Sequence, residues 1–356
     1  MTTVEVRTPA RLHLGMLSFG VPGARSYGGV GVMVDRPGVQ IRLRKHGRLE
    51  ARGPQAARAI DFARGCIRAW NLGDVGCSID VLAVPRGHAG LGSGTQLGLA
   101  VAAGMRQLYR GEPPVDELPR APTHPKQPDV EPVDHDMLFD TRDAIDLARA
   151  VGRGRRSCVG VYGFSRGGLI VEAGRPLPAA GAGEDDSDRG FSPMVARVRL
   201  PSAWRCVVIV GRDAVGLEGD AERAAFQTLP PVPREVSAEL ARIALLELLP
   251  AAVEGRFGEF ATAVGEYGRL AGVPFATESR RLPHAAATET LLELLRELGV
   301  GGCAQSSWGP AVMACCESLA AAADLVDRLD QLGLAEHHDI VIARFDTQGA
   351  SLRIVD

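Results

Sequence analysis

The part of the sequence that most constrains the fold lies between residues 77 and 109, where a strand, a glycine-rich loop and a helix follow one another. The apolar strand CSIDVLAVP leads into GLGSGTQLGLA, and an alanine-rich helix follows over 95–109. Glycines let a backbone come close to a ligand, and the start of a helix offers unpaired N–H groups and the positive end of its dipole. Gly90, Gly92 and Gly94 therefore predict an anion site, and the same pattern is also typical of an ordinary glycine-rich turn.

Composition limits what that anion can be. The chain has 356 residues, of which 46% are hydrophobic, and this is enough to bury the cores of two lobes. Its formal net charge is -3, so no bulk attraction to nucleic acid or to an anionic membrane is expected, and a small phosphorylated ligand fits better. Lys45 and Lys126 are its two lysines, and neither follows a glycine as a Walker loop requires.

The start of the chain and its cysteines indicate where the protein works. The N-terminal segment lacks the apolar core of a secretion signal, and no window is apolar enough over eighteen or so residues to span a bilayer. We therefore expect a cytoplasmic protein. The seven cysteines are odd in number and lie among apolar residues, which predicts reduced core thiols instead of a disulfide framework.

The order of elements predicts an α+β fold of two lobes, residues 1–200 and 201–356, with a ligand cleft between them. In the first lobe the expected strands span 4–9, 28–34, 39–44 and 77–85, the expected helices span 55–71, 95–109 and 141–151, and two more strands flank the turn SRGG at 165–168. In the second lobe we expect a strand at 204–211, helices near 218–228, 233–249, 254–271, 284–298 and 317–333, and a last pair of strands.

Two segments interrupt this pattern. Residues 111–136 are rich in proline and acids and predict a solvated surface loop. Its metal-binding candidates lack the regular spacing of a closed zinc site, so an ordinary charged loop is favoured; they are His124, Asp134, His135 and Asp136. An acidic, glycine-rich break follows at 181–190.

Three further polar stretches raise the odds of a ligand site. The first is PARLHLG at 9–15, where Arg11 and His13 alternate with leucines in a strand and so point to one side, away from the core. A lone histidine is often structural, and with an arginine on the same face the structural and functional interpretations are equally good. His13 could accept a proton or hold a carboxylate.

The other two stretches offer hydrogen-bond donors. GRGRRS at 152–157 places three arginines beside Ser157, a cluster able to clamp phosphate and equally typical of a solvated face. QSSWGP at 305–310 places two hydroxyls and an indole in one loop, where Trp308 also suits a core anchor.

These four motifs carry a family resemblance. PARLHLG, GLGSGTQ and a late glycine-proline loop resemble the three motifs of the GHMP superfamily of small-molecule kinases. RLHLG, GLGSGTQLGLAV, GRGRRSCVG with FSRGG, and QSSWGP together resemble the beta-ribofuranosylaminobenzene 5'-phosphate synthases, a branch of that superfamily without kinase activity that includes related C-nucleoside synthases.

The resemblance implies a GHMP-like fold and a reaction of 5-phosphoribosyl 1-diphosphate with an aromatic carboxylate such as 4-aminobenzoate, releasing carbon dioxide and diphosphate. It implies Mg²⁺ as cofactor and a homodimer, with no nucleic acid or membrane as partner. We predict Arg11, His13, Ser306 and Ser307 as catalytic residues. The predicted substrate-binding residues are Gly90, Gly92, Ser93, Gly94, Thr95, Gln96, Arg153, Arg155, Arg156, Ser157 and Trp308. The metal ligands are not assigned.

Three alternatives stay open. A C-nucleoside synthase would use a heterocyclic carboxylate, and a kinase of the same superfamily would use ATP. In such kinases an acidic base commonly precedes the GG turn, whereas this chain has Cys158 and Val159 there, which argues against phosphoryl transfer. The chain also departs from RSGIG, the pattern expected for the synthases, because Cys158 replaces its first glycine. A regulator that binds phosphate without catalysis is disfavoured by four polar motifs.

Overall fold

The computed structural model describes residues 2–20, 25–110, 141–176, 190–214, 216, 229–275 and 284–355. Three predicted segments lie outside these residues. They are the loop at 111–136 with its candidate ligands, all but the last residue of the acidic break at 181–190, and the helix at 218–228.

A seven-stranded sheet forms the larger layer, with the order β13-β1-β3-β5-β4, and β6 and β8 extend it from β3. Its strands are β1 (Thr3–Met16), β3 (Gly29–His46), β4 (Glu50–Arg52), β5 (Gly76–Ala83), β6 (Leu169–Glu172), β8 (Met194–Val198) and β13 (Ser351–Val355). The two strands expected at 28–34 and 39–44 are one continuous strand, β3, which pairs with β1 along most of its length. A separate short pair joins β2 (Arg25–Ser26) to β7 (Arg175–Pro176).

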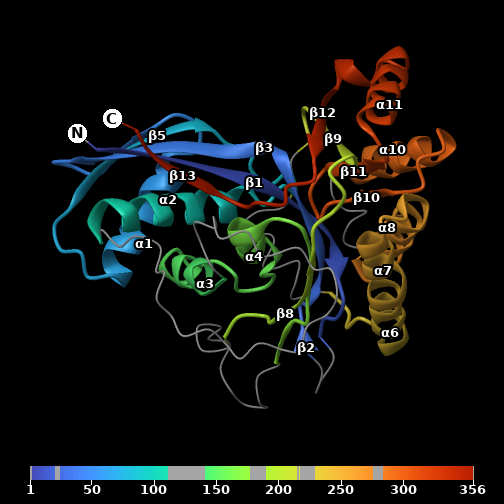
Figure 1. Ribbon diagram of the computed structural model, residues 1–356, viewed down its shortest axis with the longest axis horizontal. Coiled ribbons are helices and arrows are strands. Elements are labelled where there is room, and N and C mark those ends of the chain that lie inside the picture. Colours follow the sequence, from blue (N-terminus) through green and yellow to red (C-terminus); the bar gives the residue numbers. More distant parts are fainter. Residues whose placement is uncertain are drawn as a thin grey trace.

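Four helices cover one side of this sheet in Figure 1: α1 (Ala56–Ala69), α2 (Ser93–Tyr109), α3 (Thr141–Ala150) and α4 (Val159–Arg166). Helix α2 is buried over 12 of its 17 residues, because the sheet and the other three helices surround it. Small residues permit this close packing. A side chain at Gly104 would collide with Leu43 of β3, and one at Gly98 would press on Phe62 of α1.

The strand expected before the SRGG turn is wrong, since residues 159–166 form helix α4. All seven residues from Val159 to Ser165 are buried, and a short, fully apolar run does not reveal by its period whether it is a strand or a buried helix. Gly163 gives α4 a flat face against Met33 of β3, where a side chain would collide.

The C-terminal elements build a four-stranded sheet with the order β10-β11-β9-β12. Its strands are β9 (Arg205–Gly211), β10 (Cys303–Gln305), β11 (Ala311–Cys316) and β12 (His338–Arg344). One face packs on α10 (Ala285–Glu297) and α11 (Leu319–Gln331), and the other faces the helices α6 (Arg234–Ile243), α7 (Leu249–Glu254) and α8 (Phe257–Gly272). A π-helical turn (Ala244–Leu248) joins α6 to α7, and short 3-10 turns span Val273–Phe275 and Leu334–Glu336. The helix predicted at 233–249 therefore continues to Glu254.

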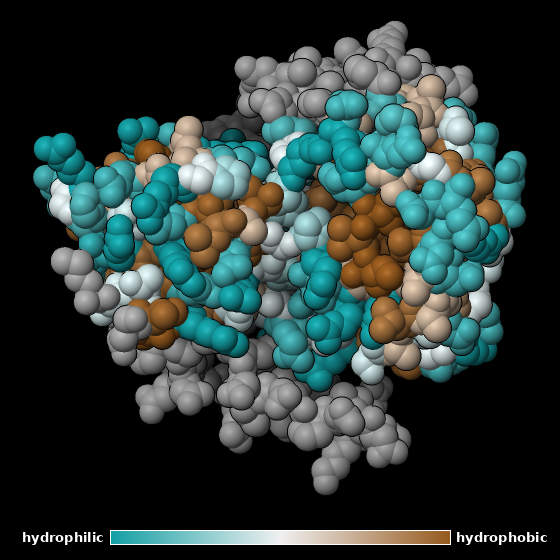
Figure 2. All heavy atoms as spheres, turned by 90° about the horizontal axis from the view of Figure 1, so that it is seen from above, coloured by the Kyte–Doolittle hydropathy of each residue, from teal (hydrophilic) through white to brown (hydrophobic). Residues whose placement is uncertain are grey.

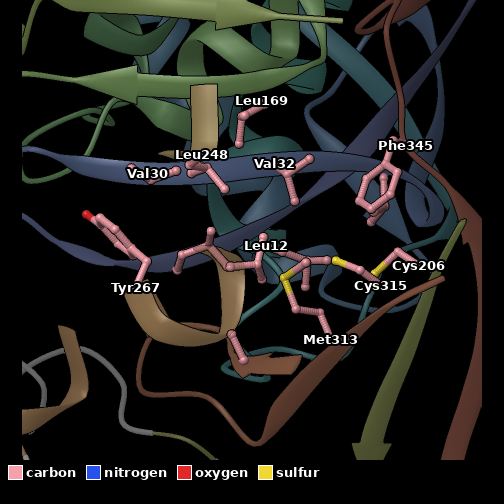
Figure 3. Packing of buried hydrophobic residues seen from close by; sticks show 14 of the residues in the cluster. Leu12, Val30, Val32, Leu169, Cys206, Leu248, Tyr267, Met313, Cys315 and Phe345 are labelled. Atoms are coloured by element: carbon pink, nitrogen blue, oxygen red, sulfur yellow. The ribbon is translucent and has the colours of Figure 1, made fainter. Parts of the chain in front are cut away.

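The two sheets share one hydrophobic core, shown in Figure 3. Leu12, Val32 and Leu169 of the first sheet and Met313 and Cys315 of the second lie in one cluster, to which helix α8 and the π-helical turn also contribute. The α+β architecture is as predicted. The last strand, β13, returns to the first sheet and pairs with β1, which brings the two ends of the chain together in Figure 1. The division at residue 200 stays a prediction.

All seven cysteines are buried and none forms a disulfide, as their apolar neighbours predict. Within the described ranges, each helix is too short or too polar to cross a membrane.

Candidate functional site

Three of the four predicted motifs meet at the side chain of Ser306. Its hydroxyl accepts a hydrogen bond from the backbone N–H of His13 at 2.9 Å and donates one to the carbonyl of Gly90 at 2.7 Å. The backbone N–H of Ser307 donates to the carbonyl of His13 at 2.9 Å. Ser306 is fully buried, so its hydroxyl joins β1, the glycine-rich loop and the loop after β10, and it acts as a positioning group.

The glycine-rich loop needs its glycines for two different reasons. Gly90 and Gly92 have φ of +88° and +68°, a left-handed conformation that other residues avoid. A side chain on Gly90 would also collide with the backbone of Ser306, and a Cβ on Gly92 would lie 3.0 Å from the Cβ of Arg11. The loop is therefore pressed between β1 and the 305–310 loop.

Helix α2 starts at this loop with no side-chain cap. The carbonyl of Gly92 accepts from the N–H groups of Thr95 and Gln96 at 3.0 Å, and Ser93 is buried in the first turn. Two guanidinium groups lie beside it: Arg11 contacts Gly92, and Arg58 of α1 lies over Gly94. Arg11 also donates from Nη1 to the carbonyl of Gly90 at 3.5 Å. This turn has the donors and the positive charge that an anion needs.

His13 lies next to Arg11 on one face of the sheet, as the alternation in β1 predicts. The expectation that this face points away from the core is wrong, because helix α4 covers it and His13 is only 3% exposed. A Cβ on Gly31, the partner of His13 in β3, would lie 2.7 Å from Cγ1 of Val159 in α4. The polar face of β1 is thus an interior surface.

The His13 imidazole is a neutral hydrogen-bond donor. Its Nδ1 accepts from the backbone N–H of Gly15 at 3.2 Å, which leaves the proton on Nε2. Burial, with a contribution from the charge of Arg11, lowers the pKa of His13 to about 3. The Nε2 atom is buried and has no hydrogen-bond partner among the described residues. These facts favour a donor over the proton acceptor that the sequence left open.

Glu172, at the end of β6, is a carboxylate in this site that the sequence analysis missed. It is fully buried, and its Oε2 accepts from the backbone N–H of Cys158 at 2.8 Å, just before helix α4. Burial raises the pKa of Glu172, and the nearby hydroxyls of Ser157 and Ser192, the N–H of Cys158 and the charge of Arg11 oppose that shift. Its Oε1 has no hydrogen-bond partner within the described part of the chain.

The arginine cluster at 152–157 approaches the site through Ser157, which lies beside Glu172. Arg153 turns the other way and stacks over Phe62 of α1, with 4.9 Å from its guanidinium carbon to the ring centroid. Arg155 is exposed and Arg156 is half-buried. Arg153 therefore packs against α1, and the phosphate-binding role of the cluster stays a prediction.

The remaining predicted residues divide into structural and accessible positions. Gln96 is fully buried and its Nε2 donates to the carbonyl of Gly160 at 2.7 Å, which ties α2 to α4. Thr95 packs beside the same glycine. Ser307, with φ of +58°, and Trp308 are half-buried at the tip of their loop. Gln96 thus joins two helices while its Oε1 has no partner among the described residues, and Thr95 is half-buried beside it.

A separate pocket of about 640 Å³ lies between the lobes, behind the glycine-rich loop. Leu91, Val208, Val210 and Val341 are among its apolar lining residues, and Arg86 and Asp339 form an ion pair at its edge. None of the predicted site residues lines it. Figure 2 shows the face seen from above, where the largest apolar area lies on the side of the C-terminal elements. The described residues contain no group of three or more His, Cys, Asp or Glu placed to hold a metal ion.

The sequence carried little signal for the missed residues. Glu172 follows an apolar strand, LIVE, as an ordinary strand-end acid would, and Arg58 is one of many arginines. Only the sheet register, which pairs Glu172 with Gly29, reveals that the carboxylate faces the site.

Comparison with known proteins agrees with this architecture. A family model described as "GHMP kinases C terminal" matches residues 248–334. A homoserine kinase structure from Cytophaga hutchinsonii has a TM-score of 0.62 at 15% identity, covering 99% of this chain and 97% of that one. This likeness shows the fold, which is the predicted GHMP-like one.

Curated relatives narrow the family. The beta-ribofuranosylphenol 5'-phosphate synthase of Methanothermobacter thermautotrophicus is 27% identical over 86% of this chain and 87% of its own length. The enzyme of the same name from Archaeoglobus fulgidus is 29% identical over 73% of this chain and 74% of its own length. The chain is thus similar to these synthases over most of its length, and its C-terminal part matches a GHMP family model. The predicted family is therefore confirmed, and the relatives' names specify a phenol product where the sequence resemblance gave an aminobenzene.

The likeness to these synthases fits a chain that has the glycine-rich loop and has Cys158 and Val159 where a kinase acid is expected. The position before α4 holds Cys158, whose thiol is buried and has its pKa raised to about 12 by burial, so it is inert at neutral pH. The carboxylate next to this helix comes instead from Glu172 of β6.

Proposed function

We propose that the protein is a decarboxylating C-glycoside synthase that joins 5-phosphoribosyl 1-diphosphate to an aromatic carboxylate. The ring carbon that bears the carboxylate forms a bond to C1 of the ribose, while the C1–O bond breaks and its electron pair leaves with diphosphate. The bond between ring and carboxylate then breaks, carbon dioxide leaves, and its electron pair restores the aromatic ring. No oxidant or reductant is needed.

The observation that carries this proposal is the uncapped start of α2 between two guanidinium groups. Departing diphosphate develops negative charge, and donors fixed in advance stabilise such charge without reorganising. The carbonyl of Gly90 and the backbone of His13 are held by Ser306, so the loop is fixed before the substrate arrives. Arg11 and Arg58 lie where they can contact the diphosphate.

Mg²⁺ fits this site as an ion carried by the substrate. The hydroxyls of Ser93 and Thr95 lie in the first turn of α2, and the described residues provide no cage of carboxylates there. Bound to diphosphate oxygens and water, the ion would neutralise part of the charge on the leaving group.

The acceptor is an aromatic acid with an electron-donating group conjugated to the attacking carbon. The names of the curated relatives specify a phenol, which for those proteins points to a hydroxyl substituent. Both 4-hydroxybenzoate and 4-aminobenzoate have such a group, and a heterocyclic carboxylate is the alternative for a C-nucleoside pathway.

The test is a panel of carboxyl-labelled acids incubated with 5-phosphoribosyl 1-diphosphate and Mg²⁺. We expect labelled carbon dioxide and diphosphate in equal amounts, and no ADP from ATP with small alcohols. Formation of ADP without carbon dioxide from any acid would show a kinase instead. Release of carbon dioxide with a heterocyclic acid alone would assign the C-nucleoside alternative.

A further inference from the structure

Two of the buried polar atoms that the proposed chemistry has not yet used lie on the same face of the first sheet. One is Nε2 of His13, a donor, and the other is Oε1 of Glu172. The side chain of His13 is 3% exposed and that of Glu172 is fully buried. A buried polar atom without a partner costs about 1–3 kcal/mol, so a pair of them calls for a ligand group that satisfies both.

Sheet register places these atoms beside each other. The His13 ring lies over Gly29 of β3, because a Cβ on Gly29 would be 3.3 Å from Nε2. Gly29 is the direct partner of Glu172 in β6, and side chains directly opposite on one face have Cβ atoms about 4.5–5.5 Å apart. The missing side chain of Gly29 therefore lets the imidazole lie against β3, on the same face of the sheet as the carboxylate.

The negative charge of Glu172 limits which ligand groups can bind beside His13. Glu172 repels a phosphate or a second carboxylate, so the anionic parts of the substrates belong at the glycine-rich loop beside Arg11. Along β1, His13 lies two residues from Arg11, a rise of about 6.6 Å, close to the length of a benzene ring with its para substituents. An aromatic acid placed with its carboxylate end toward Arg11 thus brings its other end to His13 and Glu172.

We propose that His13 and Glu172 form the subsite for the electron-donating hydroxyl or amino group of the aromatic acceptor, with His13 as hydrogen-bond donor and Glu172 as proton acceptor. This rests on the proposed function. As the ring carbon bonds to C1 and diphosphate leaves, the proton of the hydroxyl passes to Oε1 of Glu172. After carbon dioxide departs, the ring oxygen takes the proton back, so no proton is gained or lost overall.

The surroundings support this exchange. Burial raises the pKa of Glu172 toward that of a phenol, which makes the proton easier to share. The hydroxyl of Tyr267, which points away from the other labelled side chains in Figure 3, donates to the carbonyl of Gly15 at 3.3 Å and so ties helix α8 to β1 two residues after His13.

The test compares Glu172→Gln with the wild type on two acceptors, 4-hydroxybenzoate and 3,5-difluoro-4-hydroxybenzoate. The glutamine keeps the acceptor for the Cys158 N–H and loses the proton-accepting oxygen. The fluorinated acid is already ionised at neutral pH and needs no proton acceptor. We expect kcat for 4-hydroxybenzoate to fall at least about 100-fold and kcat for the fluorinated acid to fall less than about fivefold. The affinity for 5-phosphoribosyl 1-diphosphate should stay within about threefold.

Glu5→Gln is the matched control, because Glu5 is also a buried glutamate of the same sheet but is paired with Arg7 and Arg42 far from the glycine-rich loop. It should leave both rates unchanged. An equal loss on both acceptors in Glu172→Gln would overturn the proposal and leave Glu172 with a helix-capping role. If that variant does not fold, Glu172→Asp, which withdraws the carboxylate, should show the same preference for the ionised acceptor.

Failure of the proposed function gives a different result. If the wild type turns over no aromatic acid, calorimetry in the presence of 5-phosphoribosyl 1-diphosphate still tests the subsite. The wild type should bind 4-hydroxybenzoate at least about tenfold more tightly than benzoate, and Glu172→Gln should bind the two equally. Equal binding by the wild type would overturn the subsite.

Discussion

Removing the hydroxyl of Ser306 should lower the free energy of unfolding more than removing another buried serine hydroxyl. In Ser306→Ala the buried N–H of His13 loses its acceptor, at about 1–3 kcal/mol. The carbonyl of Gly90 keeps its 3.5 Å contact with Arg11, so its loss is smaller. We expect a total of about 2–3 kcal/mol. The control, Ser165→Ala, breaks one bond to the carbonyl of Tyr162 within helix α4 and should cost about 1 kcal/mol.

Thermal unfolding separates the two variants. Each kcal/mol lowers the midpoint by about 1–2 °C in a chain of 356 residues, so Ser306→Ala should lose about 2–6 °C and its control about 1–2 °C. In calorimetric titration with 5-phosphoribosyl 1-diphosphate and Mg²⁺, Ser306→Ala should bind more weakly than the wild type and the control should not. The reason is that the hydroxyl no longer joins the glycine-rich loop to β1. Equal midpoints and equal affinities for the two variants would refute the bridging role of the hydroxyl.

Three further predictions concern the same site. Gly92→Ala and Gly94→Ala should both weaken calorimetric binding of 5-phosphoribosyl 1-diphosphate. Only Gly92→Ala should lower the free energy of unfolding, by about 1–2 kcal/mol, because only Gly92 has a positive φ. The pKa of His13 is about 3 in the folded state and near 6.5 in the unfolded state, so the unfolded chain binds the proton first and the free energy of unfolding falls as the pH drops from about 6.5 to 3. In denaturation curves measured over this pH range, His13→Gln should make that fall less steep. An unchanged slope would contradict a buried, neutral imidazole. Arg155→Ala should raise the Michaelis constant of one substrate at least about tenfold, or about 1.4 kcal/mol, and an unchanged constant for both substrates would remove Arg155 from the site.

The parts of the fold that follow from local pattern could be predicted. The strand, loop and helix from β5 to α2 need only a strand period, three glycines and an apolar run, and helices α1, α8, α10 and α11 lie within a few residues of their expected bounds. Helix α4 was mistaken for a strand because burial on all sides removes the alternation that distinguishes the two.

The candidate site could also be predicted only in part. The meeting of His13, the glycine-rich loop and Ser306 was predictable from motifs, whereas the burial of His13 was not, because it depends on a helix 146 residues later in the chain. The contribution of Glu172 depends on the register of β6 against β3, and register is a tertiary property.

Helix α2 has one more consequence, which concerns how the sequence can vary. An ordinary surface helix has an outer side where substitutions cost little, but 12 of the 17 residues of α2 are buried and several of its small residues touch the sheet or α1 directly. Added methylenes there would push the helix off β3 and carry the glycine-rich loop with it. The segment from Leu97 to Met105 should therefore be the least tolerant of substitution in a saturation library of the first sheet and its helices, although it lies outside the predicted substrate-binding residues.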